Sequence, residues 1–166
     1  MPMPHSITAE PNALPAGSHV LTLEGAMPAE GLKPGTRIVT RDTGASVLRA
    51  VQVQKMPIDA VQVAAGTLGP GRPTHDVVLP ARAELLLRGD HALAHSGQPF
   101  ALVRAEALVD GRRVRALGLV RLRLVHLSFD RRHVVYADGL ELASAAPLTE
   151  PDRGTPPAAS RADPRR

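Results

Sequence analysis

EGLKPGTRIVTRDTG, at residues 30–44, contains a short β-branched segment between two groups of turn residues. Ile38, Val39 and Thr40 favour an extended backbone, because side chains branched at Cβ pack well on a pleated surface. Pro34-Gly35 precedes this segment and Asp42-Thr43-Gly44 follows it, and Gly and Asp tolerate the positive φ that tight hairpins demand. The stretch therefore predicts a strand over Arg37–Arg41 that ends in a turn.

The same pattern of short apolar segments bounded by Gly, Pro or Asp-Gly recurs along the chain and predicts an all-β fold. Val51–Gln54 and Arg121–His126 alternate apolar and polar residues, so each should place one face in the core and one in water. One short helix is expected at Arg104–Val109. The predicted strands are His19–Leu23, Arg37–Arg41, Val47–Gln54, Val61–Ala64, Asp76–Leu79, Leu85–Arg88, Arg113–Leu117, Arg121–Leu127 and His133–Ala137.

Length and composition indicate one domain with loose ends. The chain has 166 residues, of which 43% are hydrophobic, and this is enough for one real core. The only aromatic residues are Phe100, Phe129 and Tyr136, so the core should be aliphatic. Pro-containing polar sequence at both ends predicts a disordered lead at residues 1–12, a domain at 13–146 and a disordered tail at 147–166.

Composition also argues against several classes of protein. Cysteine is absent, which excludes disulfides, thiolate metal sites and cysteine nucleophiles. Met1–Leu23 has no Lys or Arg and no continuous apolar run, and nowhere is there an apolar run of about 20 residues. We therefore expect no signal peptide and no membrane segment, with a cytoplasmic location or export without a leader.

The net charge of +4 raises the question of nucleic-acid binding. The excess is mostly arginine scattered along the chain, and three separated aromatic residues cannot build a stacking platform for single strands. Nucleic-acid binding is therefore unlikely, and we expect the arginines to be dispersed over the surface rather than gathered into one groove.

Several blocks, in order, resemble the Hint (Hedgehog/intein) domains of bacterial proteins. Leu14–Val20 is similar to the family's first strand, Glu30–Gly44 to its most specific block and His126–Gly139 to its closing block. Ala65–Gly69 and Leu108–Gly111 resemble two shorter landmarks. The resemblance implies a twisted, horseshoe-like β-fold with pseudo-two-fold symmetry, whose self-cleaving site lies where the two halves meet.

The resemblance also implies which residues should carry the chemistry, and both have changed. The family uses Cys or Ser at the start of the first block to attack the preceding carbonyl, and that position is Ala13 here. A His that polarises the scissile amide falls on Ala83, or on Arg82 if the block slips by one residue. The resemblance places Ala13 and Ala83 together in space as the remains of one site.

This degenerate Hint domain is therefore expected to be no enzyme and to need no cofactor. The terminal His-Asn signal of inteins is also missing, because Leu140–Ser144 follows the closing block. The leading hypothesis is a non-catalytic binding or scaffold module with an unknown protein partner. The alternatives are residual self-cleavage by a nucleophile at another position and a basic nucleic-acid-binding module.

Two groups of histidines are further candidate sites. His91 and His95 have the i, i+4 spacing of helical metal ligands, but Gly89, Gly97 and Pro99 favour a loop, so metal binding is only a weak hypothesis. A second group is expected to be a structural cluster, with a turn Asp and imidazoles bonded to backbone; it contains His126, Asp130 and His133. None of the seven serines lies in the G-x-S-x-G pattern of a serine hydrolase.

Overall fold

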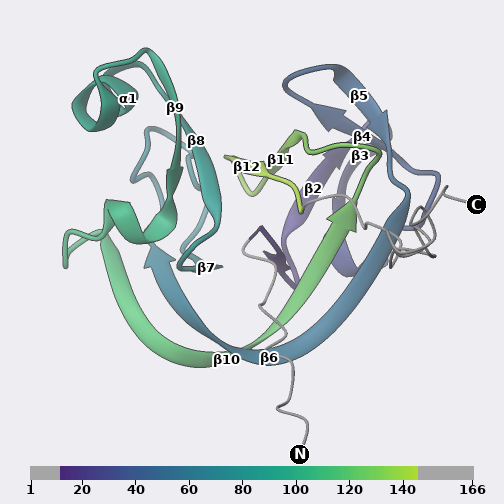
Figure 1. Ribbon diagram of the computed structural model, residues 1–166, viewed down its shortest axis with the longest axis horizontal. Helices are drawn as coiled ribbons and strands as arrows, with labels where there is room; N and C mark the ends of the chain where they lie inside the picture. Colours follow the sequence, from purple (N-terminus) through teal and green to yellow (C-terminus); the bar gives the residue numbers. More distant parts are fainter. Residues whose placement is uncertain (1–11, 146–166) are drawn as a thin grey trace, which may run out of the picture.

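The fold is organised around two long antiparallel strands, β6 (Ala50–Val63) and β10 (Val114–Ser128). The computed structural model describes residues 12–145, so the predictions for residues 1–11 and 146–166 lie outside the described part of the chain. The two strands pair from Val63 opposite Val114 to Ala50 opposite Ser128 and curve together as a broad arc (Figure 1). This arc is the base of the predicted horseshoe.

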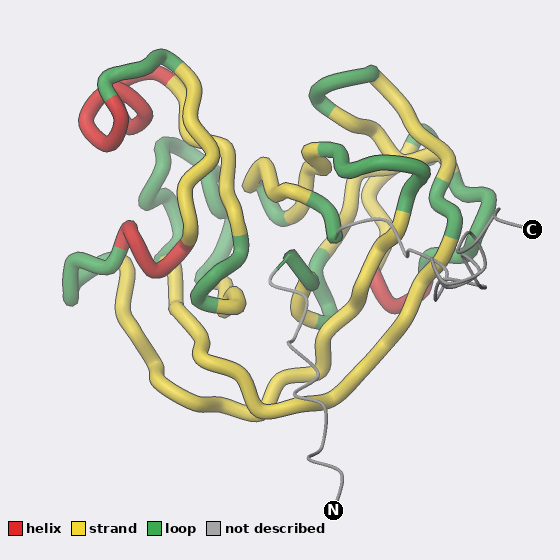
Figure 2. Tube along the Cα trace, in the orientation of Figure 1, coloured by secondary structure: helices red, strands yellow, loops and turns green. Residues whose placement is uncertain are grey.

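Two groups of elements stand on the two ends of the arc (Figures 1 and 2). The α-helix lies at one end, and each group contains one 3₁₀ turn. The strands form two sheets. The four-stranded sheet has the order β1-β10-β6-β7, and the eight-stranded sheet has the order β3-β2-β4-β11-β12-β8-β9, with β5 paired to β4. The remaining elements are β1 (Leu14–Pro15), β2 (His19–Thr22), β3 (Gly25–Pro28), η1 (Ala29–Gly31), β4 (Arg37–Thr40), β5 (Gly44–Val47), β7 (Val77–Pro80), β8 (Glu84–Arg88), α1 (Gly89–Ser96), β9 (Phe100–Arg104), η2 (Ala105–Leu108), β11 (Val134–Ala137) and β12 (Leu140–Ala143).

The core is aliphatic, as predicted, apart from Phe129. Val61 and Val63 of β6 are buried under one end of the arc, and Leu124 and Val125 of β10 are buried under the other. Between these ends, residues 54–59 of β6 and 120–123 of β10 alternate between half-buried and exposed, because the middle of the arc lies away from the hydrophobic core. Burial of apolar side chains at the two ends therefore holds the curved strands in place.

The arc corrects the predicted strand boundaries. Val47–Gln54 and Val61–Ala64 were expected as separate strands, but most of both belongs to the continuous β6. Pro57 is compatible with this strand because β7 pairs only with residues 60–63, so no neighbour on that side needs its missing N–H. In the same way β10 runs through Gly118, where the register shifts at a bulge.

The helical prediction was also incomplete. Arg104–Val109 contains the 3₁₀ turn η2, and the α-helix of the described residues is α1, in the stretch that was expected to be a loop. Gly97 adopts φ of 73° and its N–H bonds to the carbonyl of Leu93, so Gly97 ends the helix. No helix in residues 12–145 is long and apolar enough to cross a membrane.

Gly139 is a position where the fold leaves no room for a side chain. Its φ is +80°, and a Cβ there would collide with the carbonyl oxygen of Gly71. We expect Gly139→Ala to lower the free energy of unfolding by about 2 to 3 kcal/mol, because strain and overpacking add. Gly111→Ala is the matched control, since its φ is +76° but nothing lies within 4 Å of its Cβ. Equal urea-unfolding midpoints for the two variants would contradict the collision.

Candidate functional site

Asn12 and Ala13 directly precede β1, and both are buried. β1 pairs with β10 through Leu14 opposite Val125, which fixes the two preceding residues in the interior. Ala13 is 1% exposed and Ala83 is 4% exposed. Both positions that the resemblance assigns to catalysis are therefore buried methyl groups, whereas Arg82 is exposed.

Two hydrogen bonds join the segments that contain these alanines. The backbone N–H of Glu84 donates to Asn12 Oδ1 over 2.9 Å, and Asn12 Nδ2 donates to Glu84 Oε1 over 3.2 Å. The residue before Ala13 is thereby held against the residue after Ala83, although 72 positions separate them in the sequence. The fold brings together the two segments that were predicted to meet.

Glu84 supplies a fixed negative charge at this junction. Arg132 Nη2 donates to Glu84 Oε1 over 2.6 Å. Burial alone would raise the pKa of Glu84, but the hydrogen bonds from Asn12 and Arg132 and the charges of Arg132 and Arg104 outweigh it and lower the pKa. A carboxylate has no proton to donate to a departing amine, so Glu84 in this form cannot act as a general acid.

The Glu84 contacts predict a pH dependence of stability. Because the pKa is lower in the folded state, the stabilisation is fully present above the ordinary value of 4.5 and is lost as pH falls through the folded-state pKa. We expect Glu84→Gln to lower the urea midpoint at pH 7 and to converge with the unsubstituted chain in acid. Arg132→Gln should lose only a fraction of this pH-dependent part, because Asn12 and Arg104 also lower the pKa of Glu84. A constant difference at all pH values would contradict this assignment.

His126, Asp130 and His133, predicted as one cluster, take different partners. Asp130 accepts two hydrogen bonds from the guanidinium of Arg49, each of 3.0 Å, on the surface. His126 is a buried residue of β10. His133 lies just before β11 and bonds to side chains rather than to backbone through its ring.

The ring of His133 connects two residues of the β4–β5 hairpin. Its Nδ1 lies 2.7 Å from Asp42 Oδ2, and its Nε2 lies 3.1 Å from Ser46 Oγ. Sequence reasoning placed Asp42 in the turn correctly but missed this contact, because 91 residues separate Asp42 from His133. The contact depends on the pairing of β4 with β11, and no local sequence pattern indicates that pairing.

His91 and His95 lie on α1, so the prediction of a loop for them was wrong. Both are exposed, one helical turn apart, and they line a pocket of about 310 Å³ with Asp90 and Asp110. Gly89 and Gly97 mark the ends of the helix and do not interrupt it. Within residues 12–145, no group of three or more His, Asp or Glu side chains could hold a metal ion.

Glu141 is a buried carboxylate that sequence reasoning did not single out. It is 2% exposed, and three guanidinium groups approach it, from Arg88 at 3.1 Å, Arg41 at 3.3 Å and Arg72 at 3.6 Å. We predicted that the arginines would be dispersed over the surface, and these three arginines around Glu141 are an exception. Arg41 also lies over the ring of Phe100, 5.0 Å from its centroid. These contacts join the turn that follows β4, the strands β8, β9 and β12, and the loop before β7.

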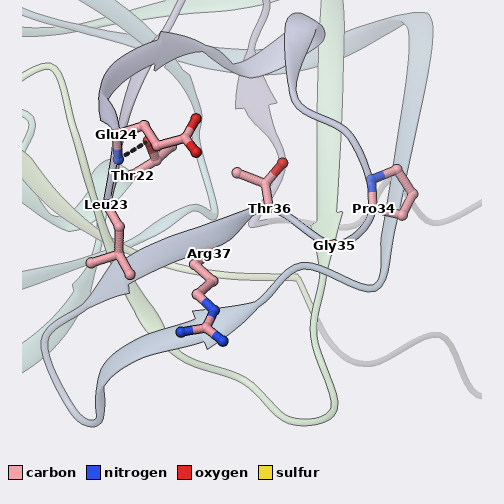
Figure 3. Close-up of a pocket in the computed structure, with 7 residues that line it drawn as sticks. All are labelled: Thr22, Leu23, Glu24, Pro34, Gly35, Thr36 and Arg37. Carbon is pink, nitrogen blue, oxygen red and sulfur yellow. Dashed lines mark hydrogen bonds between the residues drawn. The ribbon is translucent and has the colours of Figure 1, made fainter.

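A pocket of about 530 Å³ lies between the β2–β3 turn and the start of β4 (Figure 3). Thr22 Oγ1 accepts a hydrogen bond from the Glu24 amide over 3.1 Å there and donates to the carbonyl of Gly25 over 2.7 Å. These bonds stabilise the turn itself. The lining residues include neither a histidine nor any residue that the sequence predicted as part of a site: Thr22, Leu23, Glu24, Pro34, Gly35, Thr36 and Arg37.

Comparison with known proteins gives one family and one fold. A sequence profile described as the Hint domain matches residues 13–148. The MchDnaB-1 intein with the N145AA change is similar, with a TM-score of 0.51, 14% identity and coverage of 81% of this chain and 100% of the intein. The bacterial intein-like domain from Clostridium thermocellum has a TM-score of 0.51 and 13% identity over 81% of this chain and 98% of that domain.

A DnaB intein from Synechocystis sp. PCC 6803 is similar too, with a TM-score of 0.50 and 11% identity over 80% of this chain and 98% of the intein. No curated protein sequence matches the chain. At such low identity the solved structures establish the fold alone, and they agree with the sequence profile, which covers most of the chain. The chain belongs to the Hint domain family.

Proposed function

We propose that this Hint domain neither splices nor cleaves itself and persists as a binding or scaffold module for a protein partner. The observation that carries the proposal is the buried methyl group of Ala13 at the position that the resemblance assigns to the nucleophile. An acyl shift needs a thiol or hydroxyl there to attack the preceding carbonyl, and a methyl group has no lone pair. The proposal therefore concerns only the splicing and self-cleavage reactions of the Hint family.

Neighbouring groups do not supply the missing chemistry. Ser18 Oγ donates to the carbonyl of Pro15 over 2.7 Å, so this hydroxyl is engaged within its own turn. Glu84 is held as a carboxylate by Asn12 and Arg132. These contacts support the loss of self-cleavage, and the aliphatic core beneath both ends of the arc supports a fold that is stable without the reaction.

The intact mass of the full chain tests the proposal. We expect the same mass before and after overnight incubation at pH 7, with or without dithiothreitol, because no thioester or ester forms at Ala13 for the thiol to attack. A thiol-dependent loss of residues 1–12 would overturn the proposal and establish residual processing. Tight binding of duplex DNA whose affinity falls steeply with salt would instead support a nucleic-acid-binding module.

A further inference from the structure

Ser46, His133 and Asp42 have the geometry of a nucleophile, its base and the residue that orients the base. Ser46 Oγ lies 3.1 Å from His133 Nε2, and His133 Nδ1 lies 2.7 Å from Asp42 Oδ2. Both distances are within hydrogen-bond reach, which is the arrangement that activates a serine hydroxyl. We propose that Ser46 is a nucleophile that accepts the acyl group of a small carboxylic ester and passes it to water.

The surrounding hydrogen bonds select the protonation state that this role requires. Asp42 Oδ1 accepts a hydrogen bond from the amide of Val134 over 3.2 Å, which favours the carboxylate. Burial alone would raise the pKa of Asp42, but the hydrogen bonds from His133 and Val134 outweigh it and lower the pKa. A carboxylate can only accept, so in the neutral imidazole the Nδ1 proton faces Asp42 and the lone pair of Nε2 faces Ser46.

His133 is fixed in this orientation by its surroundings. Its side chain is 5% exposed, and its ring meets that of Phe129 edge to face with centroids 5.3 Å apart. Its amide donates to Ser144 Oγ over 2.9 Å, and its carbonyl accepts from the Ser144 amide over 2.7 Å. A base held by packing and backbone bonds loses little entropy when it takes the serine proton.

Ser46 and His133 open into a pocket of about 370 Å³. Ala45, Val47 and Phe129 give it apolar walls, and its volume suits a small molecule rather than a polymer. Arg49 and Asp130, which pair with each other, also line it, as does the exposed Arg131, whose guanidinium can attract an ester that carries a negative charge. The substrate class that fits is therefore a short acyl ester.

The strand also provides a donor for the oxyanion. The Leu48 amide donates to Thr36 across the hairpin, whereas the Arg49 amide donates to Ser128 on the other side. Because backbone groups alternate along a strand, the Val47 amide points to the same side as that of Arg49, away from β4, and both residues line the pocket. The amide that follows the nucleophile is thus free of the β4 ladder and available to the developing negative charge.

The reaction balances without any further reagent. Ser46 Oγ attacks the ester carbonyl carbon while His133 Nε2 takes its proton, and the oxygen of the alcohol then leaves with that proton. Water attacks the acyl-serine, giving its proton to His133, and the carboxylic acid departs as Ser46 regains its hydrogen. This site shares no residue with the junction at Ala13 and Ala83, so it is independent of the lost self-cleavage.

A fluorophosphonate probe and p-nitrophenyl acetate test the proposal on the full chain. We expect one probe adduct per chain, located on Ser46 by peptide mass, and ester hydrolysis that falls roughly 100-fold or more in Ser46→Ala and in His133→Asn. Ser96→Ala removes a different serine, in α1, and should change neither result. Thermal unfolding and circular dichroism of each variant report whether it is folded.

Ser46→Cys keeps the test decisive if the other variants unfold. With His133 as its base, the introduced thiol should react with iodoacetamide at least ten times faster at pH 7 than a free cysteine. Asp42→Asn in the same background should remove this acceleration by favouring the wrong tautomer. Absence of an adduct on the folded chain, an adduct retained by Ser46→Ala, or an unaccelerated thiol would each overturn the proposal.

Discussion

Replacing Glu141 by alanine is expected to lower the free energy of unfolding by about 3 kcal/mol, because it leaves three converging guanidinium groups without their counter-charge. Glu141 is 2% exposed, and its ion pairs join segments up to 100 residues apart. The arginines are 24 to 40% exposed and can turn partly toward water, which keeps the loss below that of a fully buried pair. Urea unfolding at pH 7 measures the change.

Glu106→Ala is the matched control for this prediction. Its ion pair with Arg104 spans 3.7 Å, and about half of each side chain is exposed. Exposed pairs of this kind contribute about 0 to 1 kcal/mol. Glu141→Gln should fall between the two alanine variants, since it keeps the volume and removes the charge. Similar losses for Glu141→Ala and Glu106→Ala would show that the buried group does not hold the segments together.

Glu141 also illustrates what the sequence could not predict. β12 reads Leu-Glu-Leu-Ala, and all four residues are buried, so the alternation that identified other strands is absent. A lone glutamate between two leucines normally indicates a solvent-facing position. Here arginines from three other segments supply its partners, and no local pattern in the sequence contains that information.

The predicted strands succeeded where burial alternates. Arg37–Arg41 and His133–Ala137 correspond to β4 and β11, each with buried and less buried residues in turn. The sequence pattern did not predict β9 or α1, because the glycines at both ends of α1 favour a loop. A glycine after a segment can indicate the end of a helix as well as a turn. Gly97 has a positive φ and ends α1, so the prediction of a loop was wrong there.

The candidate site was predicted in one part and missed in another. The resemblance to Hint domains, whose site lies where the two halves of the fold meet, predicted that the segments of Ala13 and Ala83 adjoin. In the structure, hydrogen bonds between Asn12 and Glu84 join these segments. The contacts of His133 with Asp42 and Ser46 depend on how β11 pairs with β4. Local sequence contains turn and strand signals but no strand order, so this network could not be predicted.

Restoring both changed positions is expected to restore the first half-reaction of the family. In Ala13→Cys with Ala83→His, the new thiol can attack the carbonyl of Asn12, and the imidazole can protonate the departing nitrogen. Dithiothreitol should then release residues 1–12 from a chain whose unsubstituted form keeps a constant mass. Because proton transfer contributes roughly 100-fold or more, Ala13→Cys alone should cleave at least that much more slowly.

Packing decides how this experiment must be controlled. Ala83 is 4% exposed, so an imidazole there displaces neighbours and costs about 1 to 3 kcal/mol of stability. Ala13→Cys with Ala83→Leu introduces comparable bulk without a base, and its thermal unfolding separates overpacking from chemistry. If both double variants are folded and still release no residues 1–12 with dithiothreitol, Ala83 is not the position that corresponds to the family's His. The same comparison with Arg82→His then tests the alternative alignment, since that residue is exposed and tolerates the exchange.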